Sequence, residues 1–244
     1  MAKKGRTRHL KRIAIPKSIP LTTKKRSTWL IMPNPGPHTA DLSMPLAVFL
    51  RDILQIAKSS REVKSILNNR LVKVDGKIRT EPKFPVGFMD AISLEKSDKY
   101  YTLSIDHKGR LAVQEITKQE ANKKIVKVIK KHTIKKGKIN LTFHDGRNMI
   151  ADNNVRVGDS VLLSLPEAKL KSLIKLEVGS KCLITEGKHS GTIATLKEII
   201  QRKEGKENEA KLQSKDGEFT TVAKYLFAVD DSFKPLHHNV KGAV

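Results

Sequence analysis

The sequence predicts an α+β, multi-domain chain: a basic N-terminal arm, a helix pair that runs into a strand and turn, a small central β-domain and a C-terminal β-barrel. Three observations lead to this prediction. Helical spacing of apolar residues is strongest in one stretch, residues 46–67. Alternating apolar residues separated by glycine turns follow it to residue 229, as expected of short strands. Ten lysines and arginines and no acid lie in residues 3–26, a composition typical of a solvated arm.

The charge balance favours a polyanionic partner. Lysine and arginine number 48 against 25 acidic residues, which gives a formal net charge of +23. The longest apolar run, residues 46–50, is far shorter than the roughly 20 residues that cross a bilayer, and the N-terminus has no apolar core of a signal peptide. We therefore expect a cytoplasmic protein without membrane contact. The lone Cys182 has no internal disulfide partner and is interpreted as a buried small residue.

The first predicted helix covers residues 46–57. Its apolar stripe, at i, i+3, i+4, i+7, i+8 and i+11, consists of Leu46, Phe49, Leu50, Ile53, Leu54 and Ala57. A capping box of Ser59 and Glu62 opens a second helix. Its predicted buried face consists of Val63, Ile66 and Leu67.

Basic residues gather on the polar side of this element. Arg61, Lys64 and Asn68 share one side of the second helix by angle. Asp75-Gly76 is a strong signal for a two-residue hairpin. The predicted RNA-binding residues of the helix and hairpin are Arg61, Lys64, Lys73, Lys77 and Arg79.

This helix pair and strand-turn resemble the S-four RNA-binding module. The run VKVDGKIRTEPKFPVGFMDAISL, residues 72–94, is similar to the small-subunit ribosomal protein of the archaeal and eukaryotic S-four-e family, in a short form. The pieces GRTRHLKRIAIP and PGPH near the N-terminus, and IDHKGR and FHDGRNM farther on, resemble the same family in the same order. The resemblance implies a structural constituent of the 30S-type subunit whose partners are ribosomal RNA and neighbouring ribosomal proteins.

The N-terminal arm is either a solvated tail or an RNA-binding extension, and the resemblance implies the second. The stiff segment Pro33–His38 favours docking, because it is rich in turns and not low in complexity. The predicted RNA-binding residues of the arm are Lys3, Lys4, Arg6, Arg8, Lys11, Arg12, Lys24, Lys25 and Arg26.

The middle of the chain alternates as short strands do. Residues 101–105 and 111–113 flank a turn, and a capping box of Thr117 and Glu120 predicts a short helix. Residues 123–138 contain eight lysines and no acid. We expect part of this run to be a strand with a lysine-coated face, which is solvated or contacts RNA. Residues 139–143 and 149–150 form a further pair of strands around Asp145-Gly146.

The C-terminal region begins with a valine-glycine turn. The run VGSKCLITEGKHSGTIATLKEI, residues 178–199, resembles the KOW motif of an SH3-like barrel. It departs from the usual pattern at Thr192 and Ala194, and the RNA-binding prediction is limited to Lys188 and His189. Residues 219–229 are predicted to be the closing strand of the barrel.

The predicted domains are 1–42, the basic arm; 43–105, the S-four-type domain; 106–172, the central β-domain; 173–232, the KOW and SH3-like barrel; and 233–244, the basic tail. We expect no catalytic site, no metal site and no cofactor or small-molecule substrate. Phosphate-loop and H-E-x-x-H patterns are absent from the sequence, and one cysteine excludes paired-cysteine zinc spacing. His144-Asp145 and Asp106-His107 lie at predicted turns, which explains them better than acid–base catalysis does.

Two alternative functions use the same module. An RNA-modifying enzyme with an S-four targeting domain would need a separate catalytic domain, and the segments after residue 94 are short strands and lysines instead. A KOW-type transcription factor would be expected to carry an acidic or apolar partner surface. We therefore predict a ribosomal protein that binds RNA mainly through phosphate contacts.

Overall fold

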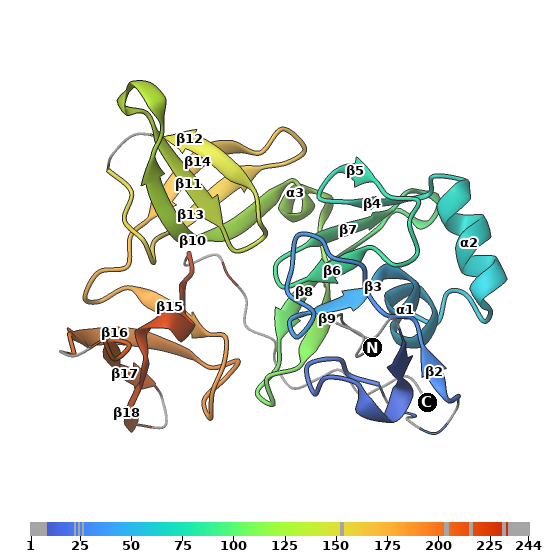
Figure 1. Cartoon of the computed structure of the whole chain (residues 1–244), viewed down its shortest axis with the longest axis horizontal. Helices are drawn as coiled ribbons and strands as arrows, with labels where there is room; N and C mark the ends of the chain where they lie inside the picture. The colour runs from blue at the N-terminus through green and yellow to red at the C-terminus, as the bar shows by residue number, and fades with distance from the viewer. Residues whose placement is uncertain are drawn as a thin grey trace, which may run out of the picture.

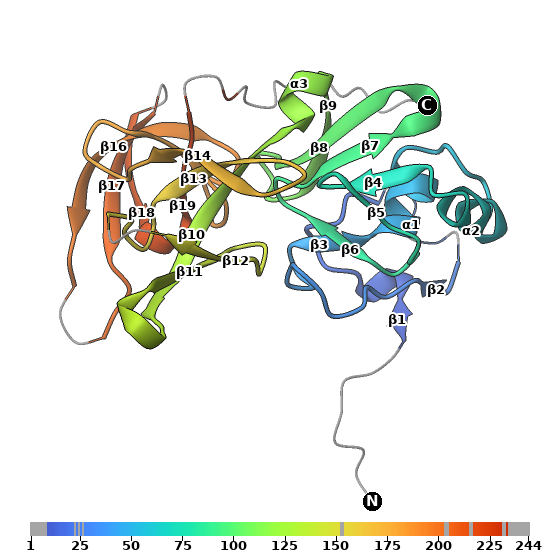
Figure 2. The same ribbon diagram turned by 90° about the horizontal axis from the view of Figure 1, so that it is seen from above.

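The computed structural model describes residues 9–21, 23, 25, 27–151, 154–202, 205–214, 217–230 and 233. Within these residues the chain forms three five-stranded antiparallel sheets, two small strand pairs and a few short helices (Figure 1). The first sheet and the N-terminal strands lie on one side of the molecule. The second and third sheets lie on the other side (Figure 2).

The N-terminal part packs onto the first sheet, whose strand order is β5-β4-β7-β8-β9. Two short strand pairs, β1 with β2 and β3 with β6, precede or flank this sheet. The elements are β1 (Leu10–Lys11), η1 (Arg12–Ala14), β2 (Trp29–Leu30), β3 (Ser43–Pro45), α1 (Leu46–Val48), η2 (Phe49–Ile53), α2 (Ser60–Asn68), β4 (Val72–Val74), β5 (Lys77–Ile78), β6 (Pro85–Gly87), β7 (Ala91–Leu94), η3 (Glu95–Ser97), β8 (Lys99–Ile105) and β9 (Leu111–Ile116).

The first helix is shorter than the sequence predicts. It changes to a π-helix at Phe49, where the amide of Leu54 donates to the Phe49 carbonyl at 2.9 Å, and it ends at Ile53. Gln55 has a φ of +54°, a left-handed conformation that no helix continues through. The prediction that the helix extends to residue 57 is therefore wrong, although Ala57 is buried as predicted.

The second helix begins where the sequence predicts. The Ser59 side chain accepts a hydrogen bond from the amide of Glu62 at 3.2 Å, and the Glu62 carboxylate accepts one from the amide of Lys58. This cap satisfies backbone donors that a helix N-terminus leaves free. Val63 and Leu67 are buried, and Ile66 is half-buried.

The second sheet has the strand order β12-β11-β10-β13-β14 and a core of its own. Its long strand β10 runs from α3, near the first sheet, into the second sheet (Figure 2). The capping box predicted for α3 is present at Thr117 and Glu120. The elements are α3 (Lys118–Ala121), β10 (Lys123–Thr133), η4 (Lys135–Gly137), β11 (Ile139–Phe143), β12 (Asn148–Ala151), β13 (Ser160–Ser164) and β14 (Lys169–Ile174).

The third sheet has the strand order β18-β17-β16-β15-β19 and buries Cys182 in its core, as predicted. The single closing strand predicted for residues 219–229 is wrong. The segment is divided between β18 and β19, which lie at opposite edges of the sheet and are joined by a 3₁₀ turn. The elements are β15 (Lys181–Ile184), β16 (Ile193–Ile200), β17 (Glu209–Ser214), β18 (Gly217–Val222), η5 (Ala223–Tyr225) and β19 (Leu226–Ala228).

The predicted domain boundaries stay predictions. Strand β9 pairs with β8, so the first sheet continues past residue 105, where the S-four-type domain was predicted to end. The three sheets each have a buried core, and the largest core joins the N-terminal strands to the first sheet.

Substitution of Phe49 by Ala should destabilise this largest core. Phe49 is fully buried, and its ring meets the edge of Tyr101 at a centroid distance of 6.2 Å. Loss of a buried phenyl ring costs roughly 3 to 5 kcal/mol. Denaturant unfolding of the full chain measures this loss. Val178→Ala is the control, because Val178 is 72% exposed and its loss should change the free energy of unfolding by less than about 0.5 kcal/mol. Equal effects of the two substitutions would contradict the assigned packing.

Candidate nucleic-acid interface

The α2 helix presents the basic face that the sequence predicts. Val63 and Leu67 point into the core, and Arg61, Lys64 and Asn68 are exposed on the other side. The helix leads through residues 69–71 into β4, so it is a close neighbour of the β4–β5 hairpin (Figure 1). We call the predicted RNA-binding residues of the helix and hairpin the S4 basic surface: Arg61, Lys64, Lys73, Lys77 and Arg79.

The three hairpin residues of this surface have different surroundings. Lys77 is exposed at the end of the two-residue turn. Lys73 is half-buried and forms an ion pair with Glu95. The guanidinium of Arg79 lies 4.3 Å from the centre of the Phe84 ring, and this stacking fixes its plane. Lys77 is thus available to an anion, Arg79 is half-buried against Phe84, and Lys73 would have to exchange Glu95 for an anion.

Lys188 and His189 lie in the loop between β15 and β16. Lys188 is exposed. The His189 ring stacks on Phe219 with a centroid distance of 4.1 Å. The backbone carbonyl of His189 accepts a hydrogen bond from the Thr192 hydroxyl at 2.7 Å. Gly187 and Gly191, which frame the loop, have φ values of +95° and +75°. The loop is therefore held in one shape, with Lys188 as its freely exposed cation.

The arm is described only in part. Lys11 and Lys25 are exposed. Arg12 is buried, donates to the Thr23 carbonyl at 2.7 Å and pairs with Asp52 of η2 at 3.2 Å. Arg12 thus ties the arm to η2 and is not part of the exposed basic surface. Six predicted residues lie outside the described residues: Lys3, Lys4, Arg6, Arg8, Lys24 and Arg26.

Strand β10 does not have the uniform lysine-coated face expected from its sequence. Lys123 and Lys130 are exposed, but the Lys124 side chain is fully buried. Lys127 is largely covered and donates to the carbonyls of Lys224 and Leu226, next to and within β19, at 2.7 and 2.6 Å. Two of these lysines therefore make contacts between the sheets.

Lys124 is surrounded by three carboxylates. Its ammonium lies 2.7 Å from Asp75, 2.6 Å from Asp90 and 3.2 Å from Asp145. Asp90 also contacts His38 at 2.9 Å, and Arg147 pairs with Asp75 and Asp145. This set, the Lys124 cluster, joins the N-terminal segment, the first sheet and the second sheet. The sequence analysis missed it, although Asp75-Gly76 and Asp145-Gly146 mark two of its turns.

The charged groups of the Lys124 cluster shift one another's pKa values. Burial would raise the pKa of Asp90, but the positive charges of Lys124 and His38 outweigh it and hold this pKa well below its usual range. Burial would lower the pKa of Lys124, but Asp90, Asp75 and Asp145 raise it instead. Lys124 is therefore charged at neutral pH, because neighbouring carboxylates favour its protonated form.

In the candidate acid–base pairs, His144-Asp145 and Asp106-His107, both aspartates accept hydrogen bonds from backbone amides of their turns. The Asp145 carboxylate accepts the amide of Arg147 at 3.2 Å, and the Asp106 carboxylate accepts the amide of His107 at 2.8 Å. His144 accepts the amide of Lys127 at 3.1 Å, and burial is the main cause that lowers its pKa to about 4. Asp145 has a second role that turn chemistry did not predict, in the Lys124 cluster.

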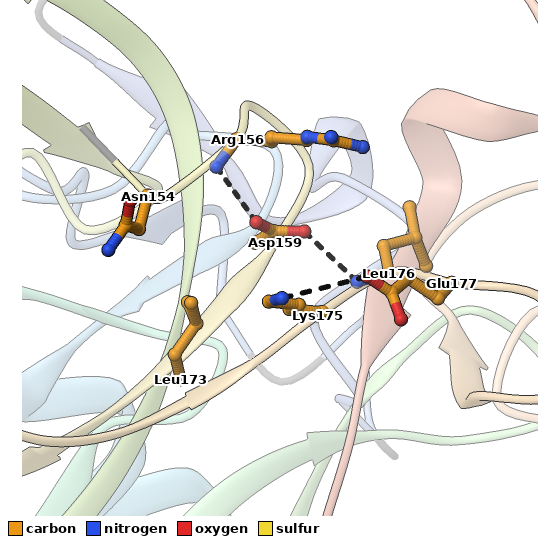
Figure 3. Close-up of a pocket in the computed structure, with 7 residues that line it drawn as sticks. All are labelled: Asn154, Arg156, Asp159, Leu173, Lys175, Leu176 and Glu177. Atoms are coloured by element: carbon orange, nitrogen blue, oxygen red, sulfur yellow. Dashed lines mark hydrogen bonds and ion pairs between the residues drawn. The ribbon is translucent and has the colours of Figure 1, made fainter.

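A surface pocket of about 530 Å³ lies next to the end of β14. Figure 3 shows Asp159 pointing between the backbone amides of Arg156 and Leu176, which donate to its two oxygens at 2.8 and 3.0 Å. Lys175 and Glu177 form a loose ion pair beside it. Both Asp159 oxygens therefore accept backbone hydrogen bonds that hold two loops together.

The structure also bears on metal and membrane binding. Among the described residues, no set of three or more histidine, cysteine, aspartate or glutamate side chains is arranged to hold a metal ion. In the same part of the chain, no helix has the length and apolar content needed to cross a membrane.

Three parts of the chain match known protein families. Residues 97–170 match the ribosomal family S4e, residues 44–92 match the S4 domain, and residues 4–41 match the RS4NT domain. The S4 match covers α2 and the β4–β5 hairpin, and hence the whole S4 basic surface.

Curated relatives and a solved structure extend these matches. The small ribosomal subunit protein eS4 of Methanosphaera stadtmanae is 44% identical over 236 residues, 97% of each chain. The eS4 protein of Methanothermobacter thermautotrophicus is 39% identical over 230 residues, 94% of this chain and 95% of that protein. The crystal structure of the 30S ribosomal protein S4e from Thermoplasma acidophilum has a TM-score of 0.68 at 36% identity, covering 79% of this chain and 97% of that one.

Replacement of Lys124 by Met should strongly destabilise the chain. Three buried carboxylates would lose their shared cation, and removal of one member of a buried ion pair costs about 3 to 5 kcal/mol. Lys123→Met is a matched control one residue earlier on β10, where the side chain is exposed. Urea unfolding of both variants measures the difference. A Lys124 variant as stable as the control would mean that the cluster does not contribute.

The free energy of unfolding should decrease as the pH is lowered through the range in which His144 titrates. The folded pKa is about 4, below the ordinary value of about 6.5, so the contribution of the neutral ring is fully present above pH 6.5 and is lost as the pH falls towards 4. His144→Gln should therefore show a shallower loss of stability between these pH values. An unchanged slope in His144→Gln would show that another group titrates.

Proposed function

The chain belongs to the ribosomal S4e family, and we propose that it binds small-subunit ribosomal RNA through the S4 basic surface as a structural constituent of the 30S-type subunit. The observation that carries this proposal is the position of that surface, on α2 and the β4–β5 hairpin within the matched S4 domain. Relatives that align over nearly the whole chain are small ribosomal subunit proteins. The protein is therefore structural and not an enzyme.

Binding through phosphates fits the charge of the chain. The net charge is +23, and 5% of the residues are aromatic, which leaves few rings for base stacking. Phosphate contacts by lysine and arginine release counterions and make affinity dependent on salt. Lys11, Lys25 and Lys188 are exposed and supply further contacts of this kind. The six basic residues of the arm outside the described part complete the proposed set.

The proposal also includes an SH3-like barrel with a KOW motif, formed by the third sheet. Its five strands, with β18 and β19 at opposite edges and a glycine-framed loop between β15 and β16, support an SH3-like barrel that carries a KOW motif. His189 stacked on Phe219 would hold this loop ready for RNA. Neighbouring small-subunit proteins are the other proposed partners, and the ribosome in the cytoplasm is the proposed location.

The two alternative functions are not supported. An RNA-modifying enzyme would need a catalytic domain, but relatives that match 94–97% of this chain are small ribosomal subunit proteins. The same alignments speak against a KOW-type transcription factor.

Neutralisation of the S4 basic surface should separate binding from folding. The variant that tests this carries five glutamine substitutions, at Arg61, Lys64, Lys73, Lys77 and Arg79. Surface substitutions usually change the free energy of unfolding by within about 0.5 kcal/mol each, whereas each lost phosphate contact reduces the slope of log K against log salt by about one unit. We expect near-normal melting, a reduced salt slope on rRNA and poor incorporation into 30S-type subunits.

A control variant of the same charge isolates the effect of position. It carries glutamine at five exposed lysines outside the surface: Lys96, Lys99, Lys108, Lys118 and Lys171. Sucrose-gradient sedimentation of reconstituted subunits measures incorporation of both variants. Full incorporation of the surface variant, or equal loss in the two, would contradict the assignment of binding to the S4 basic surface.

A further inference from the structure

A second pocket lies where three parts of the chain meet. Its volume is about 360 Å³, within the roughly 300 to 1,000 Å³ typical of pockets that hold a small ligand. It is lined by residues 36–37 of the N-terminal segment, the β4–β5 hairpin and residues 145–147 of the second sheet. A Cβ atom on Gly146 would lie 3.4 Å from the Pro37 carbonyl oxygen, so these parts approach one another closely.

The carboxylates that line this pocket have partners within the protein. Asp75 and Asp90 accept hydrogen bonds from Lys124 and from the amides of Ala91 and Gly87, respectively. The Asp145 side chain is 1% exposed and lies 3.2 Å from the Lys124 ammonium. Each of the three carboxylates therefore contacts the Lys124 ammonium.

Three cations also line the pocket: Lys77, Arg79 and Arg147. Lys77 is exposed and makes no ion pair with the described residues. Arg79 is half-buried and held flat on Phe84, and its Nε–H is buried without a hydrogen-bond acceptor in the part of the chain that the structure describes. The Arg147 side chain is 26% exposed and uses Nε and one terminal nitrogen for Asp145 and Asp75. With Lys124, these cations outnumber the three carboxylates of the pocket.

We propose that this pocket binds one backbone phosphate of RNA, shared by Arg79, Lys77 and Arg147. The stacked guanidinium of Arg79 is pre-organised for a phosphate, because arginine presents its donors as a planar fork. Arg147 is not part of the S4 basic surface, and the family matches do not assign it a role in phosphate binding. The proposal rests on the proposed function and refines it, from separate phosphate contacts along a surface to one shared contact.

Arg147 would also connect RNA binding to the arrangement of the sheets. It pairs with Asp75 of the hairpin and with Asp145 of the second sheet, so both must keep their positions for Arg147 to face the pocket. A phosphate held by Arg79 and Arg147 would thus favour the arrangement that the Lys124 cluster favours, since a ligand stabilises the conformation that it binds best.

The test is a salt titration of the full chain with purified small-subunit rRNA. The variants are Arg79→Gln, Lys77→Gln and the double variant, with Lys171→Gln as an exposed control on β14. If the two residues share one phosphate, the double variant should reduce the slope of log K against log salt by about 0.7 to 0.9 in total. Lys171→Gln should leave the slope unchanged.

The outcomes separate this inference from the proposed function. A loss of twice that size in the double variant, equal to the sum of the single losses, would overturn the shared phosphate and leave the S4 basic surface intact. No loss would overturn it too. A flat salt response of the wild-type chain would overturn the proposed function itself. The melting temperature of each variant, compared with that of the wild-type chain, shows whether the variant is folded.

Arginine footprinting of the wild-type chain needs no variant and remains decisive if Arg79→Gln fails to fold. An arginine-selective dicarbonyl reagent is applied with and without rRNA, and modification is measured at Arg147, which lies outside the S4 basic surface, and at the exposed Arg110. Protection of Arg147 well beyond that of Arg110 supports the pocket. Equal reactivity of Arg147 with and without rRNA would overturn it.

Discussion

The ammonium of Lys124, enclosed by three carboxylates, is the interaction on which the arrangement of this chain depends. Asp75 and Asp90 come from two turns of the first sheet and Asp145 from a turn of the second. Such a cluster costs desolvation energy, and its main effect is on geometry, since the three carboxylates have a matching cation in this one arrangement. Lys127, three residues along β10, adds contacts to carbonyls at β19. A single strand thus connects all three sheets.

Local patterns predicted much of the fold. The Ser59 cap, the Asp75-Gly76 hairpin and the Thr117 capping box depend on residues a few positions apart, and each lies where the sequence indicates. The end of the first helix was not predictable in the same way, because Gln55 adopts a left-handed conformation that its residue type does not favour. The division of residues 217–228 into two edge strands depends on closure of a sheet, which a strand pattern does not encode.

In the candidate site too, local sequence predicts some features, and others depend on residues far apart in the sequence. Arg61 and Lys64 are exposed as predicted, because helical angle alone separates them from Val63 and Leu67. The basic residues that turned out to be buried are Arg12, whose carboxylate partner is 40 residues away in the sequence, and Lys124, whose partners Asp75 and Asp90 are 49 and 34 residues away. A lysine with a distant buried aspartate looks the same in a sequence as a lysine on an RNA-binding face. Only the folded chain distinguishes a cation that holds the sheets together from one that is free to bind phosphate.

The most direct test of this account is a distance across the junction. Spin labels at Lys64→Cys on α2 and Lys171→Cys on β14, in a chain with the buried Cys182 changed to Ala, report the relative position of the first and second sheets by pulsed electron paramagnetic resonance. The account predicts one narrow distance distribution, which broadens when Lys124→Met is added under conditions where each sheet is still folded. A distribution that stays equally narrow with Lys124→Met would contradict the claim that the Lys124 cluster sets the arrangement.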